Sequence, residues 1–510
     1  MNFIRVIFLF LISIIAAFLT FGCAEPLPPE QEAIINELNQ RELPAWYDRA
    51  KFGIFIHWGP YAVPAFAPID SDINDALANH YDDFFLHMPY VEWYWNALQF
   101  EGSATRQYHV ENYGEGYSYD NFGQIFKGAL SEWHPEEWAN LFAAAGARYV
   151  VLVTKHHDGF LMWPSDHPNP KKPNWYSDRD IVGEMADAVR DRGMKFGIYY
   201  SGGVDWAWNP RSGRTLVDFT SALPIDAEFV PYVETHLREL ITRYKPAVLW
   251  NDFSYPGNQG LWEMIRDYYE AVPEGVVNDR WSVLTPLAKR FQNSWLRDIF
   301  HGLLKFLIQL GGNNLSALQS TPPPHYDFRT LEYTNMEAIM AEKAEVTRGM
   351  GLGFGYNQIE PECVKLSEKE LIHSLIDIVS KNGNLLLNVG PKMNGDIQDI
   401  ERKRLEQVGA WLAINGTAIY ASKPWIQAEG KTTSGNDIRF TQNEETVFAI
   451  ILNDLISGPV RIINIIPDSL SSVELLGYGP VTWNLDETDI IVELPEEVIM
   501  RVAYTVALHK

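Results

Sequence analysis

Two acidic residues stand where the sequence predicts the ends of buried β-strands. Asp252 closes the apolar run AVLWND (247–252), and Glu332 lies in the run RTLEYT (329–334). A carboxylate at the end of a core strand costs free energy unless it is paired, exposed in a cleft or used. Two carboxylates that flank one bond can hydrolyse a glycoside, because one attacks or activates water and the other protonates the leaving oxygen. Glycoside hydrolysis is therefore the first chemistry to consider.

This chemistry sets different demands on the two carboxylates. Arg280 and nearby histidines would hold Asp252 ionised. Glu332 would need an apolar or like-charged surrounding to keep its proton near neutral pH. The sequence does not give the separation of the two groups, so retention and inversion of the anomeric configuration both stay open.

A metal-dependent hydrolase is the competing interpretation. His57, His156, His157 and Asp252 could together bind Zn²⁺. However, the chain shows no HExxH or HxH spacing around them, and adjacent residues on one strand point to opposite faces. Neutral histidines that hydrogen-bond sugar hydroxyls account for the same residues without a metal. We therefore expect the carboxylate pair and no cofactor or metal.

Short apolar runs alternate with helical patterns along most of the chain. The expected strands are 52–58, 149–157, 196–202, 247–252, 275–281, 329–334, 351–357 and 384–390. The expected helices include 135–147, 182–193, 232–245 and 367–383, whose apolar residues recur every three or four positions. Strand–helix alternation predicts a parallel sheet, and eight such strands predict an α/β fold of the irregular (β/α)₈, TIM-like barrel type. An open doubly wound sheet is the alternative, although no GxGxxG follows any strand.

Most of these strands end in polar or aromatic side chains. In a barrel such strand ends converge on one face, where catalytic groups sit. The residues concerned are His57, His156, His157, Tyr199, Asp252, Arg280, Glu332, Tyr356 and Asn388. We therefore expect Asp252 to point into a pocket.

The barrel is predicted for residues 30–425, and the two ends of the chain have different residue patterns. Residues 426–510 contain short alternating runs broken by Gly, Asn and Pro, which predict a C-terminal antiparallel β-sandwich. Residues 1–23 have a basic start and a long apolar run, as in a secretory signal. The stretch TFGC (20–23) resembles a bacterial lipobox, so lipid attachment at Cys23 is an alternative to plain export. The expected location is periplasmic, outer-membrane-anchored or secreted.

Composition narrows the class of protein and of partner. The chain has 510 residues, 46% of them hydrophobic and 21% charged, as in a folded globular protein. Its net charge of −25 argues against nucleic acid as a partner. With Cys23 in the leader, Cys363 remains as a lone thiol, expected to be structural, and no disulfide framework is possible. A homo-oligomer is left open.

Several longer motifs together resemble the α-L-fucosidases of glycoside hydrolase family 29. They are WYDRAKFGIFIHWGPYAVPAF, VEWYWN, VVLVTKHHDGFLMWPSD, FGIYYSGGVDW, AVLWND, VVNDRW, HYDFRTLEY and GNLLLNVGPK. The likeness runs from about residue 44 to 425, and KHHDGF and LWND are its most specific parts. It implies a retaining exo-α-L-fucosidase on a barrel, without a metal, acting on fucosylated oligosaccharides or glycoconjugates.

The resemblance also assigns roles to individual residues. Asp252 in LWND matches the family nucleophile, and Glu332 in RTLEY matches the acid/base. The fucose pocket would be formed by His57, Glu92, Trp93, His156, His157, Tyr199, Trp250 and Arg280. Trp93 and Trp250 would lie under the apolar face and methyl group of the sugar, whereas Trp58, Trp95 and Trp206 are expected only to pack around the pocket.

One segment departs from the family pattern, and two other functions stay open. Residues 285–324 form an apparent insertion with an apolar helical middle (295–310), expected to pack on the barrel or, alternatively, to cover the acceptor side. Because the insertion precedes Glu332, it weakens that assignment more than that of Asp252. The alternatives are an enzyme for a related sugar such as α-L-galactose, which an apolar wall rejects only weakly, and a non-catalytic fucose-binding protein.

Overall fold

The computed structural model describes most of the chain. The described residues are 27–219, 223–224, 226–258, 260–283, 297–298, 301–302, 305, 322–454, 458–463, 465, 470–496 and 502–510. The predicted leader, Cys23 and most of the predicted insertion lie outside them. Within the described part, no helix is both long and apolar enough to cross a membrane.

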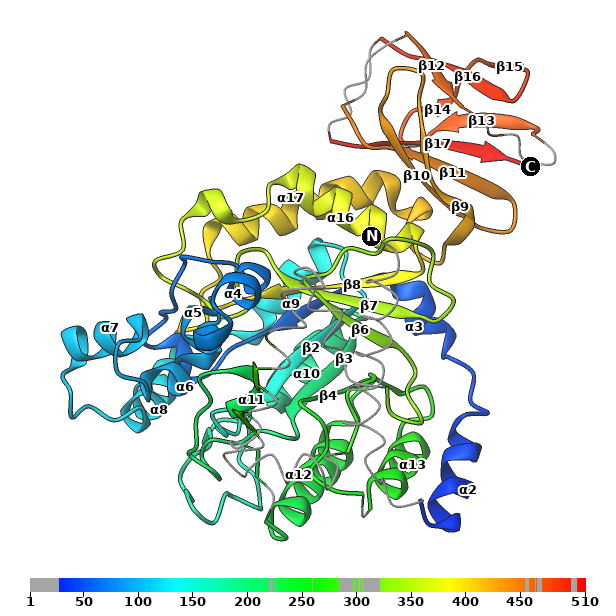
Figure 1. Cartoon of the computed structure of the whole chain (residues 1–510). Helices are drawn as coiled ribbons and strands as arrows, with labels where there is room; N and C mark the ends of the chain where they lie inside the picture. The colour runs from blue at the N-terminus through cyan, green and yellow to red at the C-terminus, as the bar shows by residue number, and fades with distance from the viewer. Residues whose placement is uncertain are drawn as a thin grey trace.

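Eight parallel strands form a curled, TIM-like sheet whose neighbours follow the order β5-β4-β3-β2-β1-β8-β7-β6 (Figure 1). Their bounds are β1 Phe52–Ile56, β2 Tyr149–Lys155, β3 Lys195–Ser201, β4 Val248–Asp252, β5 Val276–Val277, β6 Arg329–Glu332, β7 Ala344–Gly349 and β8 Gly383–Val389. A parallel bridge between Asn278 and Phe328 connects the two outer strands. The predicted irregular barrel is confirmed, with β5 as its shortest strand.

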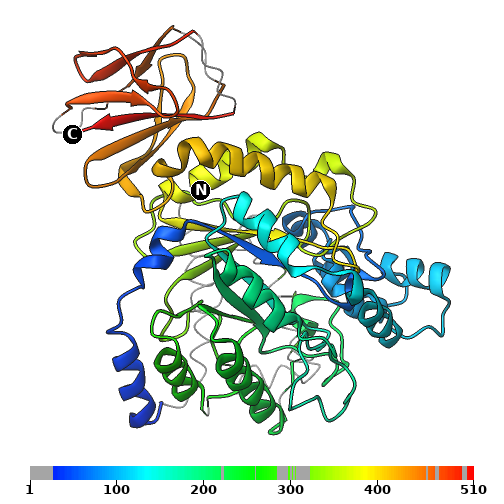
Figure 2. The same ribbon diagram turned by 180° about the vertical axis from the view of Figure 1, so that it is seen from behind.

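Helices cover the outside of the barrel, and several short ones surround one end of it (Figures 1 and 2). The covering helices are α9 Pro135–Ala144, α10 Ile181–Asp191, α12 Phe229–Tyr244, α13 Leu261–Ala271, α16 Glu368–Ser380 and α17 Asp399–Asn415. The remaining ones are α2 Pro29–Leu38, α3 Ala45–Ala50, α4 Ile73–Asn79, α5 Phe84–His87, α6 Tyr94–Leu98, α7 Ala104–Tyr113, α8 Asp120–Ala129 and α11 Leu216–Phe219. The four predicted helices correspond to α9, α10, α12 and α16.

Alternation along the strands separates the inside of the barrel from the layer under the helices. On β2, Val151 and Val153 belong to the interior cluster, whereas Val150 and Leu152 pack under the helices. Both faces are apolar because a parallel sheet covered by helices is buried on both sides. On β4, Trp250 lies in the interior cluster, so Asp252, two positions later, continues on the inner face at the end of its strand.

One predicted strand is wrong. Residues 351–357 form no strand, and β7 is instead Ala344–Gly349, which pairs with β6 and β8. The Gly-rich run that follows packs its backbone closely on other loops: a Cβ at Gly353 would lie 2.6 Å from the Pro89 oxygen. The apolar residues of 351–357 therefore gave a false strand prediction. The true strand, β7, was missed because it contains charged residues. Tyr356 is therefore not at a strand end.

The C-terminal part consists of antiparallel sheets, with strand orders β14-β13-β17-β11-β10-β9 and β12-β16-β15. The strands are β9 Lys423–Lys431, β10 Asp437–Gln442, β11 Thr446–Ile451, β12 Gly458–Ile462, β13 Ser472–Leu475, β14 Gly479–Pro480, β15 Trp483–Asp486, β16 Asp489–Leu494 and β17 Tyr504–His509. Their apolar side chains form a separate core. This unit packs against α16 through β9 and β10 (Figure 1).

Candidate active site

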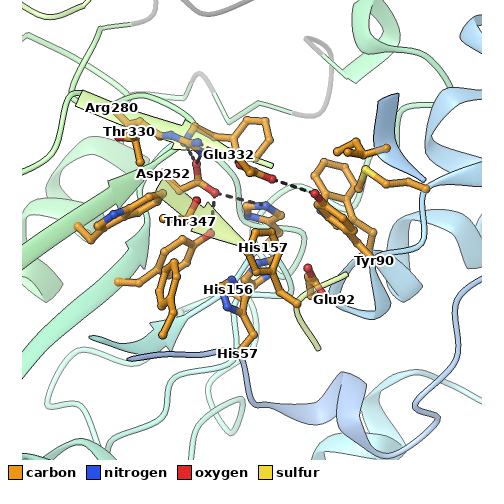
Figure 3. Close-up of a pocket in the computed structure, with 18 of the residues that line it drawn as sticks. His57, Tyr90, Glu92, His156, His157, Asp252, Arg280, Thr330, Glu332 and Thr347 are labelled. Carbon is orange, nitrogen blue, oxygen red and sulfur yellow. Dashed lines mark hydrogen bonds and ion pairs between the residues drawn. The ribbon is translucent and has the colours of Figure 1, made fainter. Parts of the chain in front are cut away.

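The carboxyl ends of the barrel strands and the loops after them enclose a pocket of about 420 Å³ (Figure 3). Its lining combines titratable side chains with a larger set of aromatic and aliphatic ones. All ten residues to which the family resemblance assigns a role line it: His57, Glu92, Trp93, His156, His157, Tyr199, Trp250, Asp252, Arg280 and Glu332. The fold thus brings together side chains from six strand ends and one loop.

Asp252, the last residue of β4, has donors on both carboxylate oxygens. Tyr199 donates its hydroxyl to Oδ2 at 2.7 Å, while Arg280 and the backbone N–H of Phe253 reach Oδ1 at 2.7 and 2.9 Å. Burial by itself raises the pKa of Asp252, but the charge of Arg280 and the hydrogen bonds from Tyr199 and Arg280 bring it below its ordinary value. Asp252 is therefore ionised at neutral pH, as a nucleophile must be.

The turn after Asp252 has a strained backbone. The φ angles are +54° at Phe253 and +72° at Ser254, a region that costs non-glycine residues of order 1–3 kcal/mol each. The turn packs directly on Gly203, where a Cβ would collide with the backbone oxygen of Phe253. The N–H of Gly203 also donates to the Asp252 carbonyl at 3.3 Å. Glycine at position 203 therefore leaves room for the backbone conformation of Phe253 and Ser254 that directs Asp252 into the pocket.

We expect Gly203→Ala to lower the free energy of unfolding by at least about 3 kcal/mol and to abolish activity, because neither backbone can move away cheaply. Gly128→Ala is the matched control, since Gly128 lies in α8 and a Cβ added there would have no other atom within 4 Å. That change should stabilise the protein by about 0.5–1 kcal/mol. Denaturant unfolding of both variants measures the difference, and equal stabilities would contradict the role of Gly203.

Glu332, the last residue of β6, shares Arg280 with Asp252. Arg280 donates from Nη2 to Oε2 of Glu332 at 3.0 Å, and the Tyr90 hydroxyl donates to Oε1 at 3.0 Å (Figure 3). The two nitrogens of one guanidinium thus span both carboxylates. This arrangement suits the closely spaced pair of a retaining glycosidase, about 5 Å apart, better than the wider pair of an inverting one.

The three histidines of the pocket are neutral. Burial lowers the pKa of His57 to about 4 and that of His157 to about 3, and it lowers the pKa of His156 well below its ordinary value. His157 Nε2 lies 3.9 Å from Asp252 Oδ2, but a neutral ring contributes no charge there. The low pKa of Asp252 is therefore due to the charge of Arg280 and to the hydrogen bonds from Arg280 and Tyr199.

Hydrogen bonds to Nδ1 fix which ring nitrogens can accept a hydrogen bond from a ligand. Asn388 uses its amide N–H on the Phe354 carbonyl, so its oxygen accepts from Nδ1–H of His57 at 2.6 Å. Ser201 donates its hydroxyl to the Val204 carbonyl, so its oxygen accepts from Nδ1–H of His157 at 2.7 Å. In both rings Nε2 is left as an acceptor, which suits sugar hydroxyl groups.

The adjacent histidines His156 and His157 both face the pocket. This contradicts the expectation that, as neighbours on one strand, they would point to opposite faces. β2 ends at Lys155, so strand alternation no longer applies to them. Their ring centroids are 4.0 Å apart, and both line the pocket. Even so, no group of three or more His, Cys, Asp or Glu side chains within the described ranges has a geometry that could hold a metal ion.

Glu92 is a buried carboxyl group on the opposite side of the pocket from Asp252 (Figure 3). It lies in the 3₁₀ helix Val91–Trp93 and accepts the backbone N–H of Gly355 at 3.1 Å. Burial raises its pKa to about 7, although backbone hydrogen bonds oppose the shift. Near neutral pH, Glu92 can therefore either donate a hydrogen bond to a sugar hydroxyl or accept one.

A second buried carboxyl group, Glu345 on β7, contacts the pocket residue Trp250 and was not singled out from the sequence. It accepts hydrogen bonds from Tyr47, Tyr149 and Trp250 Nε1 at 2.8, 2.6 and 3.1 Å. Trp250 in turn stacks on Tyr199 at 5.3 Å and lies under Arg280 at 4.8 Å. Glu345 therefore fixes the position of the Trp250 indole, which packs against both Tyr199 and Arg280, the two side chains that hydrogen-bond Asp252.

Burial raises the pKa of Glu345 to about 7, against opposing hydrogen bonds. A folded-state pKa above the unfolded value gives stability that is complete below about pH 4.5 and lost as pH rises to about 7. The difference between the folded and unfolded pKa values of Glu345 corresponds to about 3 kcal/mol of unfolding free energy. We expect Glu345→Gln to flatten the pH dependence of the unfolding free energy between these values. The exposed Glu444→Gln should leave that dependence unchanged, and a parallel shift of the Glu345→Gln curve would contradict the prediction.

Two strand-end residues expected at the site do not line the pocket. Tyr356 lies in the loop after β7, and Asn388 acts through His57. Of the tryptophans, Trp93 and Trp250 line the pocket, whereas Trp58, Trp95 and Trp206 do not. Trp206 packs behind the lining, with its ring centroid 5.4 Å from that of Trp93 and 5.6 Å from that of His157. Cys363 is free and exposed, so it has no structural packing role.

The sequence missed several lining residues. Phe55 and Thr330 precede His57 and Glu332 by two positions, so strand alternation could have found them. Tyr90 and Phe354 come from loops, where no periodicity marks them. Only the folded chain identifies Tyr90 as the partner of Glu332.

Comparison with known proteins now supplies the family. The family model described as Alpha-L-fucosidase matches residues 22–297 and 313–417, and the model of the Alpha-L-fucosidase C-terminal domain matches 431–509. The chain belongs to the α-L-fucosidase family. The gap in the α-L-fucosidase match, 298–312, falls inside the segment that the sequence sets apart as an insertion.

Individual α-L-fucosidases agree along nearly the whole chain. The human tissue α-L-fucosidase is 33% identical over 482 residues, covering 90% of this chain and 86% of its own. The Thermotoga maritima α-fucosidase in complex with fucose is 35% identical with a TM-score of 0.76, covering 93% of this chain and 98% of its own. Its complex with a mechanism-based inhibitor gives a TM-score of 0.77 at the same identity, covering 93% and 99%. The resemblance drawn from the motifs is thereby confirmed.

Proposed function

We propose that this protein is a retaining exo-α-L-fucosidase that removes terminal α-L-fucose from glycans through a covalent intermediate. The observation that carries the proposal is the arrangement of Asp252 and Glu332 around Arg280 in one pocket. The complex of the T. maritima relative with fucose supports the choice of sugar, and its complex with a mechanism-based inhibitor supports a covalent step.

In the proposed complex the sugar lies among the neutral histidines, Glu92 and Arg280. Nε2 of His57 and Nε2 of His157 accept hydrogen bonds from sugar hydroxyl groups, and Glu92 donates or accepts one according to its charge. The pocket offers Trp250 and Trp93 as apolar surfaces for the methyl group and the apolar face of the ring. These contacts hold the anomeric carbon within reach of Asp252.

Catalysis then proceeds in two displacements. Asp252 attacks the anomeric carbon while Glu332 gives a proton to the glycosidic oxygen, which yields a β-fucosyl enzyme and the free alcohol. Glu332 next takes a proton from water, which attacks the same carbon and releases α-L-fucose. Arg280 stays beside both carboxylates and stabilises whichever one is ionised at each stage.

The direct test is hydrolysis of 4-nitrophenyl α-L-fucoside and of the α-L-galactoside by the chain without residues 1–23. We expect faster release from the fucoside, with α-L-fucose as the first product seen by proton NMR. A faster reaction with the galactoside would show that α-L-galactose, and not α-L-fucose, is the preferred sugar. Tight binding of fucose without any release would favour the non-catalytic alternative.

We further propose that the protein is exported, on the basis of the basic start and apolar run of residues 1–23. If TFGC acts as a lipobox, the wild type fractionates with membranes and Cys23→Ala does not. If both forms appear in the soluble exported fraction, the protein carries no lipid at Cys23.

A further inference from the structure

The barrel closes between β5 and β6, where few backbone hydrogen bonds join the two strands. Within the described part of the chain, they share one parallel bridge, Asn278–Phe328, and form no longer ladder. Two active-site groups lie on opposite sides of this β5–β6 junction, because Arg280 follows β5 and Glu332 ends β6. The distance between them therefore depends on what takes the place of a strand ladder.

Two carboxylates bridge the β5–β6 junction. Asp279 accepts the backbone N–H of Thr330 on Oδ1 at 3.0 Å, and the Thr330 hydroxyl donates to the same oxygen. Oδ2 of Asp279 pairs with Nε of Arg329 at 3.0 Å. In the opposite direction, Oδ2 of Asp327 accepts the N–H of Val277 at 2.7 Å. Each carboxylate thus pairs a backbone donor that a longer ladder would have paired.

Asp279 lies at the end of the junction that carries the active-site groups. It directly precedes Arg280, and its partner Thr330 stands two positions before Glu332 on β6. Both Asp279 and Thr330 line the pocket. Arg280 donates to Oε2 of Glu332 at 3.0 Å (Figure 3). A shift of β6 at Thr330 would therefore move Glu332 relative to Arg280.

The nucleophile is held on the other side of β5 by separate contacts. β4 and β5 form a parallel ladder. The side chain of Asn278 extends it, because its oxygen accepts the N–H of Asn251 at 3.0 Å and its amide donates to the Asn251 carbonyl at 2.9 Å. Asn251 directly precedes Asp252. Loss of the Asp279 side chain should therefore displace Glu332 and leave Asp252 in place.

The acid/base has strict geometric requirements. It must lie within hydrogen-bond reach of the leaving oxygen, and a displacement of about 1 Å can lower a rate about 100-fold. Hydrogen bonds to an ionised carboxylate are shorter and stronger than those between neutral groups, which suits Asp279 to hold β6. We propose that Asp279 is a positioning residue that acts through Thr330 to keep Glu332 at the leaving oxygen. This role rests on the proposed fucosidase activity.

The test compares methyl α-L-fucoside, whose leaving oxygen must be protonated, with α-L-fucosyl fluoride, which needs no proton. The chain lacking residues 1–23 is used, and the readout is kcat/KM for the fluoride divided by kcat/KM for the methyl fucoside. In Asp279→Ala a displaced Glu332 should slow the methyl fucoside selectively, so this ratio should rise at least about tenfold. Asp279→Asn keeps an acceptor for the Thr330 N–H but loses the charge, so the ratio should rise less, by about threefold.

Asp327→Ala is the matched control. It removes the other carboxylate of the β5–β6 junction, which accepts the Val277 N–H at the end away from Glu332. Thermal unfolding should show that both Asp327→Ala and Asp279→Ala are less stable than the wild type. Only Asp279→Ala should change the ratio of the two rates, whereas Asp327→Ala should keep it within about twofold of the wild-type value.

The outcomes separate this role from general loosening of the barrel and from the catalytic proposal. An unchanged ratio in folded Asp279→Ala would overturn the role, and if that variant does not fold, an unchanged ratio in Asp279→Asn would do so. Equal rises in Asp279→Ala and Asp327→Ala would also overturn it. Absence of turnover of both compounds by the wild type would overturn the fucosidase activity and this role with it.

Discussion

Asp252→Ala should reduce kcat/KM for 4-nitrophenyl α-L-fucoside by at least about 100-fold. In the wild type, the charge of Arg280 keeps the Asp252 carboxylate ionised. Tyr199 and Arg280 donate hydrogen bonds to its two oxygens, which lie at the pocket end of β4. Alanine removes the attacking group but leaves the pocket and the acid in place. Initial rates at low substrate concentration measure the effect, and thermal unfolding shows whether the fold is kept.

Azide distinguishes loss of the nucleophile from loss of structure. A small anion can enter the space vacated by the Asp252 carboxylate, attack the anomeric carbon directly and give β-L-fucosyl azide, with inverted configuration. Asp267→Ala, which removes a surface carboxylate on α13 paired with Arg238, should behave like the wild type. Near wild-type activity of Asp252→Ala would exclude this residue as the nucleophile.

Glu332→Ala should have an effect that grows as the leaving group becomes poorer. For an alkyl fucoside, whose oxygen must be protonated, we expect a loss of about 10²- to 10⁴-fold. α-L-Fucosyl fluoride needs no such proton, so its first step should be nearly unaffected. A plot of log kcat/KM against the acidity of the leaving group measures this dependence and should be steeper for the variant than for the wild type.

The azide product identifies the role of Glu332. Azide needs no base, so it should speed breakdown of the fucosyl enzyme in Glu332→Ala and give α-L-fucosyl azide, with retained configuration. The opposite configurations expected from the two variants separate the acid/base from the nucleophile. Glu337→Ala, at an exposed position five residues later, is the control. Equal losses for good and poor leaving groups would contradict the assignment of Glu332.

The parts of the fold that the sequence predicted well are those with strong local patterns. Seven of the eight barrel strands appear where apolar, β-branched runs predict them, with ends shifted by a few residues. β7 was missed because Glu345 and Arg348 interrupt its apolar pattern, although Glu345 is fully buried by partners far away in the chain. Long-range hydrogen bonds made a charged residue acceptable inside the barrel, and no local pattern reports such bonds.

The sequence by itself determined which side chains follow most of the strands at their carboxyl ends, because the position of an apolar strand follows from its local pattern. It thereby brought Asp252, Glu332 and the three histidines to one pocket. Only the tertiary structure decided that Arg280 spans both carboxylates and that Tyr90 contacts Glu332. These features depend on contacts between loops and strands far apart in the chain, where distance and direction are set by packing and not by local sequence.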